Sequence, residues 1–197
     1  MSLEVSSAEF IKKFEGYIDH AKWDVDAYRI GHGSDTLELP DGTHRKVVPT
    51  DTTTRELAQK DLARRIKEEF IPKVQKTIGE PYWSKLPEMA QVALLSLAYN
   101  YGNVTKQAII DSARTGDLKK LSQAIIDSTY NDNQSQTESV RNTLRKRRAE
   151  EAGMVASAFD SAVELVKANP KTSIGIAVLI TLGLAGMGYV LYLKYKK

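Results

Sequence analysis

The sequence predicts an α+β fold, with a small antiparallel sheet near the N-terminus, a mostly helical part after it and one membrane-spanning helix near the C-terminus. Three observations support this prediction. Apolar residues recur at helical spacing at the start of the chain and again beyond residue 53. The stretch between them, from Trp23 to Pro49, has no helical period and contains turn residues. A long uncharged apolar run lies close to the C-terminus.

The first element is predicted to be a short helix. Ser6-x-x-Glu9 is a capping-box pattern, and apolar residues from Phe10 to Phe14 follow at helical spacing. Gly16 is typical of the residue that ends a helix. We therefore expect Glu15 in the last turn, with its side chain leaving the helix end.

The second element is predicted to be a pair of short strands. Ala27–Gly33 and Arg45–Val48 have strand character, and Asp41-Gly42 supplies a turn between them. The two glycines of Gly31-His32-Gly33 indicate a tight or closely packed strand, because two glycines alone do not make a phosphate-binding loop.

Helices are predicted for the remainder of the soluble part. Thr53-x-x-Glu56 is a second capping box, and Pro72 is expected to kink or end the helix that it opens. Pro87 suits the first turn of a central core helix that runs to Gly102. The remaining predicted elements are helices at 105–114, 117–128 and 137–167, a turn at Thr115-Gly116 and a polar loop at Asn131–Ser135.

The C-terminal part is predicted to anchor the chain in a lipid bilayer. The 21 residues from Ser173 to Leu193 carry no charge, and a helix of that length spans about 31 Å, close to a bilayer core of about 30 Å. We expect a helical linker at 156–171, a transmembrane helix at 172–194 and a basic tail at 195–197. The orientation of the span stays open, as does self-association through small residues on one of its faces.

Composition limits the kinds of site that the chain can build. Its 197 residues include no cysteine, which excludes disulfides, thiolate catalysis and zinc–thiolate sites. The three histidines show no metal-ligand spacing, and no glycine-rich loop opens a helix, so we expect neither a metal nor another cofactor. The net charge is only +3, and the basic run ending at Arg148 is interpreted as a solvated helix face, so no nucleic-acid partner is expected.

Two acidic residues are the informative candidates for chemistry. Glu15 is at a predicted helix end, and Asp24 follows nine positions later at the entry to the predicted sheet. Cleavage of a glycosidic bond needs one carboxylic acid that donates a proton and a carboxylate that positions water or stabilises the cationic sugar. Facing one cleft, these residues would supply both groups; the alternative is that they are two unrelated surface carboxylates.

Four sequence blocks resemble the phage-type lysozymes of glycoside hydrolase family 24. The first contains Phe14-Glu15-Gly16, Trp23-Asp24 and Tyr28–Gly33, and it is similar to the active-site stretch of that family. The other blocks are Thr53–Ala58, Gln91–Gly102 and Leu144–Glu151, in the family's order. The resemblance covers roughly residues 6 to 155. It implies a lysozyme-like catalytic domain at 1–155 that cleaves peptidoglycan between N-acetylmuramic acid and N-acetylglucosamine.

The resemblance also implies roles for individual residues. Glu15 matches the general acid of the family and Asp24 its second carboxylate, with Asp26 as the rival for the second role. One residue is missing before the strand, so Arg29 stands where the family has a threonine that helps to seat the attacking water. Ser34 or Thr36 then substitutes for it, or the enzyme handles water differently.

Further candidates and alternatives complete the hypothesis. His32 and Asn100 are candidate cleft residues. A route that uses only the glutamate and yields an anhydro sugar stays open. So does a degenerate lysozyme fold that binds glycan, or one that serves as a viral membrane structural protein. We expect location in a virion membrane or a host cell membrane, and a role in phage lysis or in penetration of the cell wall.

Overall fold

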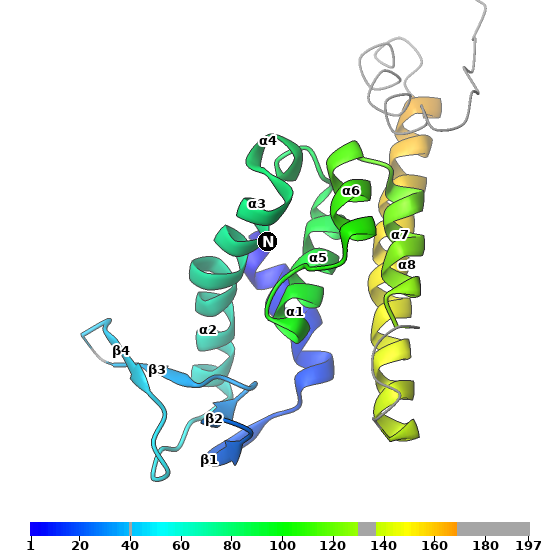
Figure 1. Cartoon of the computed structure of the whole chain (residues 1–197). Coiled ribbons are helices and arrows are strands. Elements are labelled where there is room, and N and C mark those ends of the chain that lie inside the picture. The colour runs from blue at the N-terminus through cyan, green and yellow to red at the C-terminus, as the bar shows by residue number, and fades with distance from the viewer. Residues whose placement is uncertain (40, 130–136, 169–197) are drawn as a thin grey trace, which may run out of the picture. The chain divides into compact units, whose positions relative to one another are not determined.

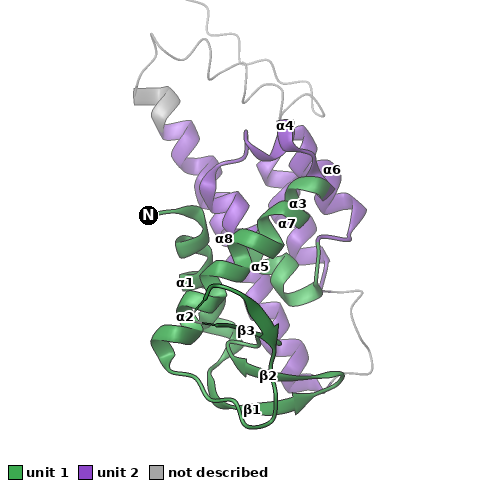
Figure 2. Ribbon diagram, turned by 90° about the vertical axis from the view of Figure 1, so that its left-hand side faces the viewer, with its two compact units in different colours: residues 1–76, 94–103 green, residues 77–93, 104–197 purple. Residues whose placement is uncertain are grey.

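The computed structural model describes residues 1–39, 41–129 and 137–168 (Figure 1). These form two compact units, which are described separately (Figure 2). The first comprises Met1–Lys76 and Leu94–Asn103, and the second Thr77–Ala93 together with the chain from Val104 onward. The α+β prediction is confirmed, since the strands all lie near the N-terminus and the described chain after them is mostly helical.

The first unit contains the strands and the first helices. Its elements in chain order are α1 (Leu3–Glu15), β1 (Ile18–Asp24), β2 (Ala27–Gly31), β3 (Thr36–Glu38), β4 (His44–Lys46), α2 (Arg55–Arg65) and the π-helix η1 (Ile66–Phe70). The helix α3 (Ile71–Ile78) follows directly. Buried aliphatic side chains from α1, β2, α2 and η1 form its core, among them Ile11, Ile30, Leu62 and Ile66.

The strands form two separate antiparallel hairpins, β1–β2 and β3–β4. The predicted pairing of Ala27–Gly33 with Arg45–Val48 is therefore wrong, although Asp41-Gly42 does lie between paired strands. β1 was not predicted because its side chains are mostly exposed and polar, so no alternation marks it. Backbone bonds hold it instead: the Ala21 amide donates to the Asp51 carbonyl over 3.0 Å, beside the bridge of His20 with Thr52.

Both predicted helix starts are wrong in register. α1 begins at Leu3, and the amides of Val5 and Ser6 donate to the Ser2 carbonyl, so Ser6 lies inside the helix and cannot cap it. α2 is capped by Thr54 rather than by its neighbour Thr53, and the Thr54 hydroxyl accepts a bond from the Leu57 amide. The first helix thus starts upstream of its capping pattern, and the second starts one residue downstream of its pattern.

The helix does not end at Pro72. The α-helical hydrogen bonding of α2 stops at Arg65, a π turn spans Ile66–Phe70, and α3 then carries the chain to Ile78. The Ile71 amide donates to the Ile66 carbonyl, five residues back. The wider turn thus immediately precedes the proline, whose ring supplies no amide donor of its own.

The second unit contains the remaining helices. They are α4 (Glu80–Trp83), the first part of α5 (Glu88–Tyr101), α6 (Gln107–Thr115), α7 (Leu118–Asp127) and α8 (Glu138–Ala168). The predicted helices at 105–114, 117–128 and 137–167 are confirmed within a few residues. Gly116 ends α6 in the left-handed conformation, at φ 69°, as the Thr115-Gly116 turn requires.

The long helix α8 packs against α7 within this unit. The Ser122 hydroxyl donates to the Ala152 carbonyl over 3.0 Å, and the Lys119 ammonium lies 4.8 Å from the centre of the Phe159 ring. Arg147, Arg148 and Glu151 are buried together, so the interpretation of the basic run as a solvated helix face is wrong at its last two arginines, which pair with Glu151 instead. The helix continues without interruption to Ala168.

The polar loop, Pro170 and the predicted transmembrane helix at 172–194 lie outside the described residues. Within the described ranges, no helix combines the length and the apolar character that a membrane crossing requires.

Candidate functional site

Glu15 is the last residue of α1 and is half-buried. Gly16 ends the helix with φ at 65°, a conformation that costs a glycine little and other residues about 1–2 kcal/mol. One turn back, the Phe10 and Phe14 rings meet edge to face with centroids 5.3 Å apart. The prediction that Glu15 terminates the first helix is confirmed.

Asp24 and Asp26 flank the turn that joins β1 to β2. The Asp26 amide donates to the Asp24 carbonyl over 2.6 Å, which closes a three-residue turn around Val25. Val25 has φ of 54°, and positive φ is unfavourable for a β-branched residue. The connection between the two strands is thus very short and strained, and both carboxylates are exposed beside it.

Arg29 on β2 binds both of these carboxylates. Its Nε lies 3.1 Å from Oδ2 of Asp24, and its Nη2 lies 3.2 Å from Oδ1 of Asp26. The strand register explains the first contact, because Asp24 faces Ala27 and Arg29 is two residues further along the same face. A guanidinium carries donors only, so Arg29 orients carboxylates but cannot accept a hydrogen bond from water.

The loop Gly31-His32-Gly33 connects this hairpin to α1, α2 and α5. A Cβ on Gly31 would lie 2.9 Å from the Ala58 Cβ, so the close approach to α2 requires glycine there. The His32 Nδ1 donates to the Gly16 carbonyl, directly after Glu15. The His32 carbonyl in turn accepts a bond of 2.7 Å from the Tyr99 hydroxyl on α5. The predicted tight packing at these glycines is confirmed.

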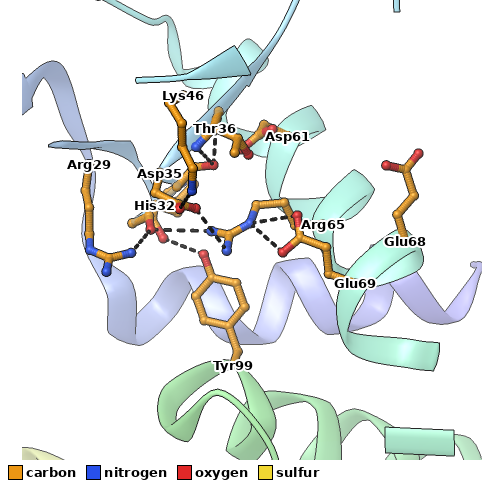
Figure 3. Close-up of polar contacts among 12 residues, drawn as sticks. Arg29, His32, Asp35, Thr36, Lys46, Asp61, Arg65, Glu68, Glu69 and Tyr99 are labelled. Carbon is orange, nitrogen blue, oxygen red and sulfur yellow. Dashed lines mark hydrogen bonds and ion pairs between the residues drawn. The ribbon is translucent and has the colours of Figure 1, made fainter. Parts of the chain in front are cut away.

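A buried arginine holds the same loop from α2 (Figure 3). Arg65 donates to the Gly33 carbonyl over 3.4 Å, and its Nε donates to the Glu69 carboxylate over 3.2 Å. Its Nη2 lies 3.7 Å from Oδ1 of Asp35, and its guanidinium lies 5.7 Å from the Tyr99 ring centre. Arg65 is not among the predicted site residues, because nothing in a charged helical stretch marks which arginine is buried.

The hydroxyl groups of Ser34 and Thr36 form hydrogen bonds with other groups of the protein. The buried Ser34 hydroxyl donates to the Thr36 carbonyl over 2.8 Å and accepts from the Thr36 amide over 3.3 Å. The Thr36 hydroxyl accepts a bond of 3.2 Å from Arg64. These bonds shape the turn into β3. Asn100, the other candidate, is half-buried next to Tyr99 near the end of α5.

Tyr99 is electrostatically linked to Glu15. Burial raises the pKa of the Tyr99 hydroxyl well above its ordinary value, against the charge of Arg65, which lowers it. The negative charges of Glu15, Asp61 and Glu69 raise this pKa further. Tyr99 therefore stays protonated near neutral pH, remains a hydrogen-bond donor to His32, and lies within the electrostatic range of Glu15.

Asp35 is ionised more easily than a free aspartate. Burial opposes this, but the hydrogen bond of 2.5 Å from Lys46 and the positive charge of Arg65 outweigh it and lower the pKa of Asp35. The loop that follows Gly33 is thus tied to β4 and to α2 by charged groups. Among the residues that the structure describes, no cluster of three or more His, Asp or Glu side chains could hold a metal ion.

The sequence from residue 12 to residue 151 matches the model of the phage lysozyme family, described as "Phage lysozyme". The chain belongs to the phage lysozyme family. It is therefore a glycoside hydrolase of this family, and peptidoglycan is the substrate that the family implies. A comparison with curated proteins gave no match.

The matched part of this phage lysozyme contains every candidate residue. It includes Glu15 at the end of α1, the two aspartates bound by Arg29 and the loop around His32. In the first unit, a half-buried carboxyl group at a helix end is followed by exposed carboxylates on a neighbouring hairpin. These are the two kinds of group that acid-catalysed cleavage of a glycosidic bond requires.

Proposed function

We propose that the protein is a membrane-anchored muramidase that hydrolyses the bond between N-acetylmuramic acid and N-acetylglucosamine in peptidoglycan. The observation that carries this proposal is the half-buried Glu15 at the end of α1, followed nine residues later by Asp24 in an ion pair with Arg29. Both residues lie in the segment that matches the phage lysozyme family.

Glu15 is the general acid in this proposal. Its carboxylic acid gives a proton to the glycosidic oxygen as the bond from that oxygen to C1 of the muramic residue breaks. A water molecule forms the new bond to C1, and the Asp24 carboxylate orients that water and takes its proton. Asp24 is favoured over Asp26 because it ends a strand and its side chain is the less exposed of the two, at 61% against 75%.

The test is the loss of turbidity of purified peptidoglycan with the wild-type chain and with Glu15→Gln. The substitution keeps the shape of the side chain but removes its proton, so kcat should fall at least about 10²-fold while the melting temperature is unchanged. Equal activity of the two proteins would refute Glu15 as the acid. A wild-type chain that binds glycan without cleaving it would support the degenerate lysozyme instead.

The membrane anchor is a separate part of the proposal. It is supported by the 21 uncharged residues from Ser173 to Leu193, whose length suits a bilayer core of about 30 Å. A single-pass anchor at the C-terminal end would hold the lysozyme at a virion membrane or a host cell membrane. In either place the enzyme would serve phage lysis or penetration of the cell wall.

Flotation with liposomes tests the anchor. The full chain should float with lipid, and a chain that ends at Asn169 should stay in the aqueous fraction. The shortened chain should keep its activity on isolated peptidoglycan, because the removed residues include no aspartate or glutamate that could act as the acid or the second carboxylate. Full-length protein that stays in the aqueous fraction would refute the span.

A further inference from the structure

We infer that His32 is a positioning residue for Glu15, acting through a hydrogen bond to the carbonyl of Gly16, the residue that follows the acid. This inference rests on the proposed function, since it assumes that Glu15 is the general acid. In this inference His32 does not donate a proton to the substrate. Its role is to hold the end of α1, from which the Glu15 side chain projects.

The bond is made at a point where the helix itself offers no partner. The carbonyl groups at the C-terminus of a helix have no amide four residues ahead to bind them. Gly16 lies just past the end of α1, and its carbonyl accepts the bond from the His32 Nδ1. Because a carbonyl only accepts, Nδ1 carries the proton in this contact. The carbonyl of the residue next to Glu15 is therefore held from outside the helix.

His32 is itself held firmly enough to act as a support. The Tyr99 hydroxyl binds its carbonyl at 2.7 Å, and the next carbonyl, of Gly33, accepts bonds from Arg29 at 3.5 Å and Arg65 at 3.4 Å (Figure 3). The contact between Gly31 and α2 fixes the residue before it. The backbone of His32 thus has restraints on both sides, from three different elements.

Tyr17, the residue after Gly16, is also restrained by contacts outside α1. The Tyr17 ring lies 5.9 Å from the His32 ring, and its hydroxyl donates to the Thr53 carbonyl over 2.9 Å. The Arg55 guanidinium covers the Tyr17 ring at 4.4 Å from its centre. Tyr17 would keep the chain close to its place without His32, so loss of the imidazole should turn the Gly16 peptide without unfolding α1.

Such a turn affects proton transfer more than substrate binding. A displacement of about 1 Å in a catalytic group can cost up to about 10²-fold in rate. We therefore expect His32→Leu, which removes the donor but keeps an apolar side chain, to lower kcat about tenfold with KM within about twofold. His32→Asn should restore most of the rate, because its Nδ2 lies the same number of bonds from the backbone as the Nδ1 of histidine.

The experiment compares steady-state hydrolysis of soluble glycan chains by the full-length wild type, His32→Leu, His32→Asn and His44→Leu. His44 is an exposed histidine on β4 and serves as the matched control. The inference is supported if kcat falls in His32→Leu but not in His44→Leu, and recovers in His32→Asn. The pH at which kcat of His32→Leu falls off should also differ from that of the wild type. If His32→Leu does not fold, His32→Ser replaces it, because the short hydroxyl cannot reach Gly16.

Two results overturn the inference. One is wild-type kcat in the folded variant that lacks the donor, and the other is an equal loss of kcat in His32→Asn and His32→Leu. Failure of the proposed function is recognised separately. In that case the wild-type chain would not cleave the glycan, or Glu15→Gln would cleave it as fast as the wild type.

Discussion

Arg29 and Asp24 form an ion pair across the first hairpin, with the guanidinium Nε 3.1 Å from the carboxylate Oδ2. The same guanidinium reaches Asp26 on the other side of the turn. Since Asp24 is 61% exposed, the pair contributes only about 0.2–1 kcal/mol to stability. Its importance lies in the direction that it gives to the Asp24 carboxylate.

Asp24→Asn should reduce the rate of peptidoglycan hydrolysis much more than Asp26→Asn. The reason is that Asp24 ends a paired strand, whereas Asp26 lies within the exposed turn. We expect a loss of about 10²-fold for Asp24→Asn and at most about threefold for Asp26→Asn, measured as kcat/KM. Each variant breaks one contact of Arg29, so each serves as the control for the other.

The opposite ranking would assign the second carboxylate to Asp26. Small and equal effects would favour the route that uses only the glutamate. In that route the C6 hydroxyl of the muramic residue attacks C1 in place of water, so the product ends in an anhydro sugar. Mass spectrometry of the wild-type products should instead find reducing muramic ends.

Arg29→Leu should lower kcat about tenfold, because Asp24 loses the donor that orients it. Arg29→Lys keeps the charge but cannot reach both carboxylates with a rigid fork, so its rate should fall between those of the wild type and Arg29→Leu. Unchanged rates in both variants would show that the Arg29 contacts have no part in catalysis.

Gly31→Ala should destabilise the protein by about 2–4 kcal/mol. The residue has φ of 64°, and the added methyl would lie 2.9 Å from the Ala58 Cβ, so backbone strain and overlap add together. Gly116→Ala is the matched control, because φ there is 69° and nothing lies within 4 Å of the added atom. Chemical denaturation should give about 1 kcal/mol for the control. Equal losses in the two variants would contradict the close packing at Gly31.

Asp35 should make the stability of the protein sensitive to acid. Its pKa is lowered on folding, so the charged form stabilises the protein above about pH 4, and this contribution is lost as the pH falls through the lower folded value. Asp35→Asn should therefore be less stable at pH 7, and its free energy of unfolding should fall less between about pH 5 and pH 2. Lys46→Met, which removes the hydrogen bond to Asp35, should weaken the same dependence. Parallel curves for wild type and Asp35→Asn would contradict the assignment.

Local patterns were sufficient to predict several elements. The central apolar helix after Pro87, the two short helices around Gly116 and the long helix up to Ala168 follow from apolar spacing and helix-ending residues. The position of Glu15 at the end of α1 follows from Gly16 in the same way. These features depend on contacts within a few residues, which a sequence displays directly.

The capping positions and the strand partners were not predictable in this way. Ser6 fits a capping box, but the amides of Val5 and Ser6 itself donate to the Ser2 carbonyl, so the helix begins before Ser6. β1 has no apolar alternation, and its bonds go to β2 and to residues 51–53, which are distant in sequence. Backbone hydrogen bonds carry no side-chain signature, so their partners depend on the folded chain.

The sequence by itself determined which residue types are available for acid catalysis and their order along the chain: Glu15, then Asp24, then Arg29. Only the tertiary structure decided that Arg29 binds both aspartates, that His32 binds the Gly16 carbonyl next to Glu15, and that Arg65 is buried and bonded to the same loop. The physical reason is that a charged or polar side chain becomes a support only when a partner is brought to it by packing. Gly31, Ala58 and Tyr99 bring those partners together from three separate parts of the sequence.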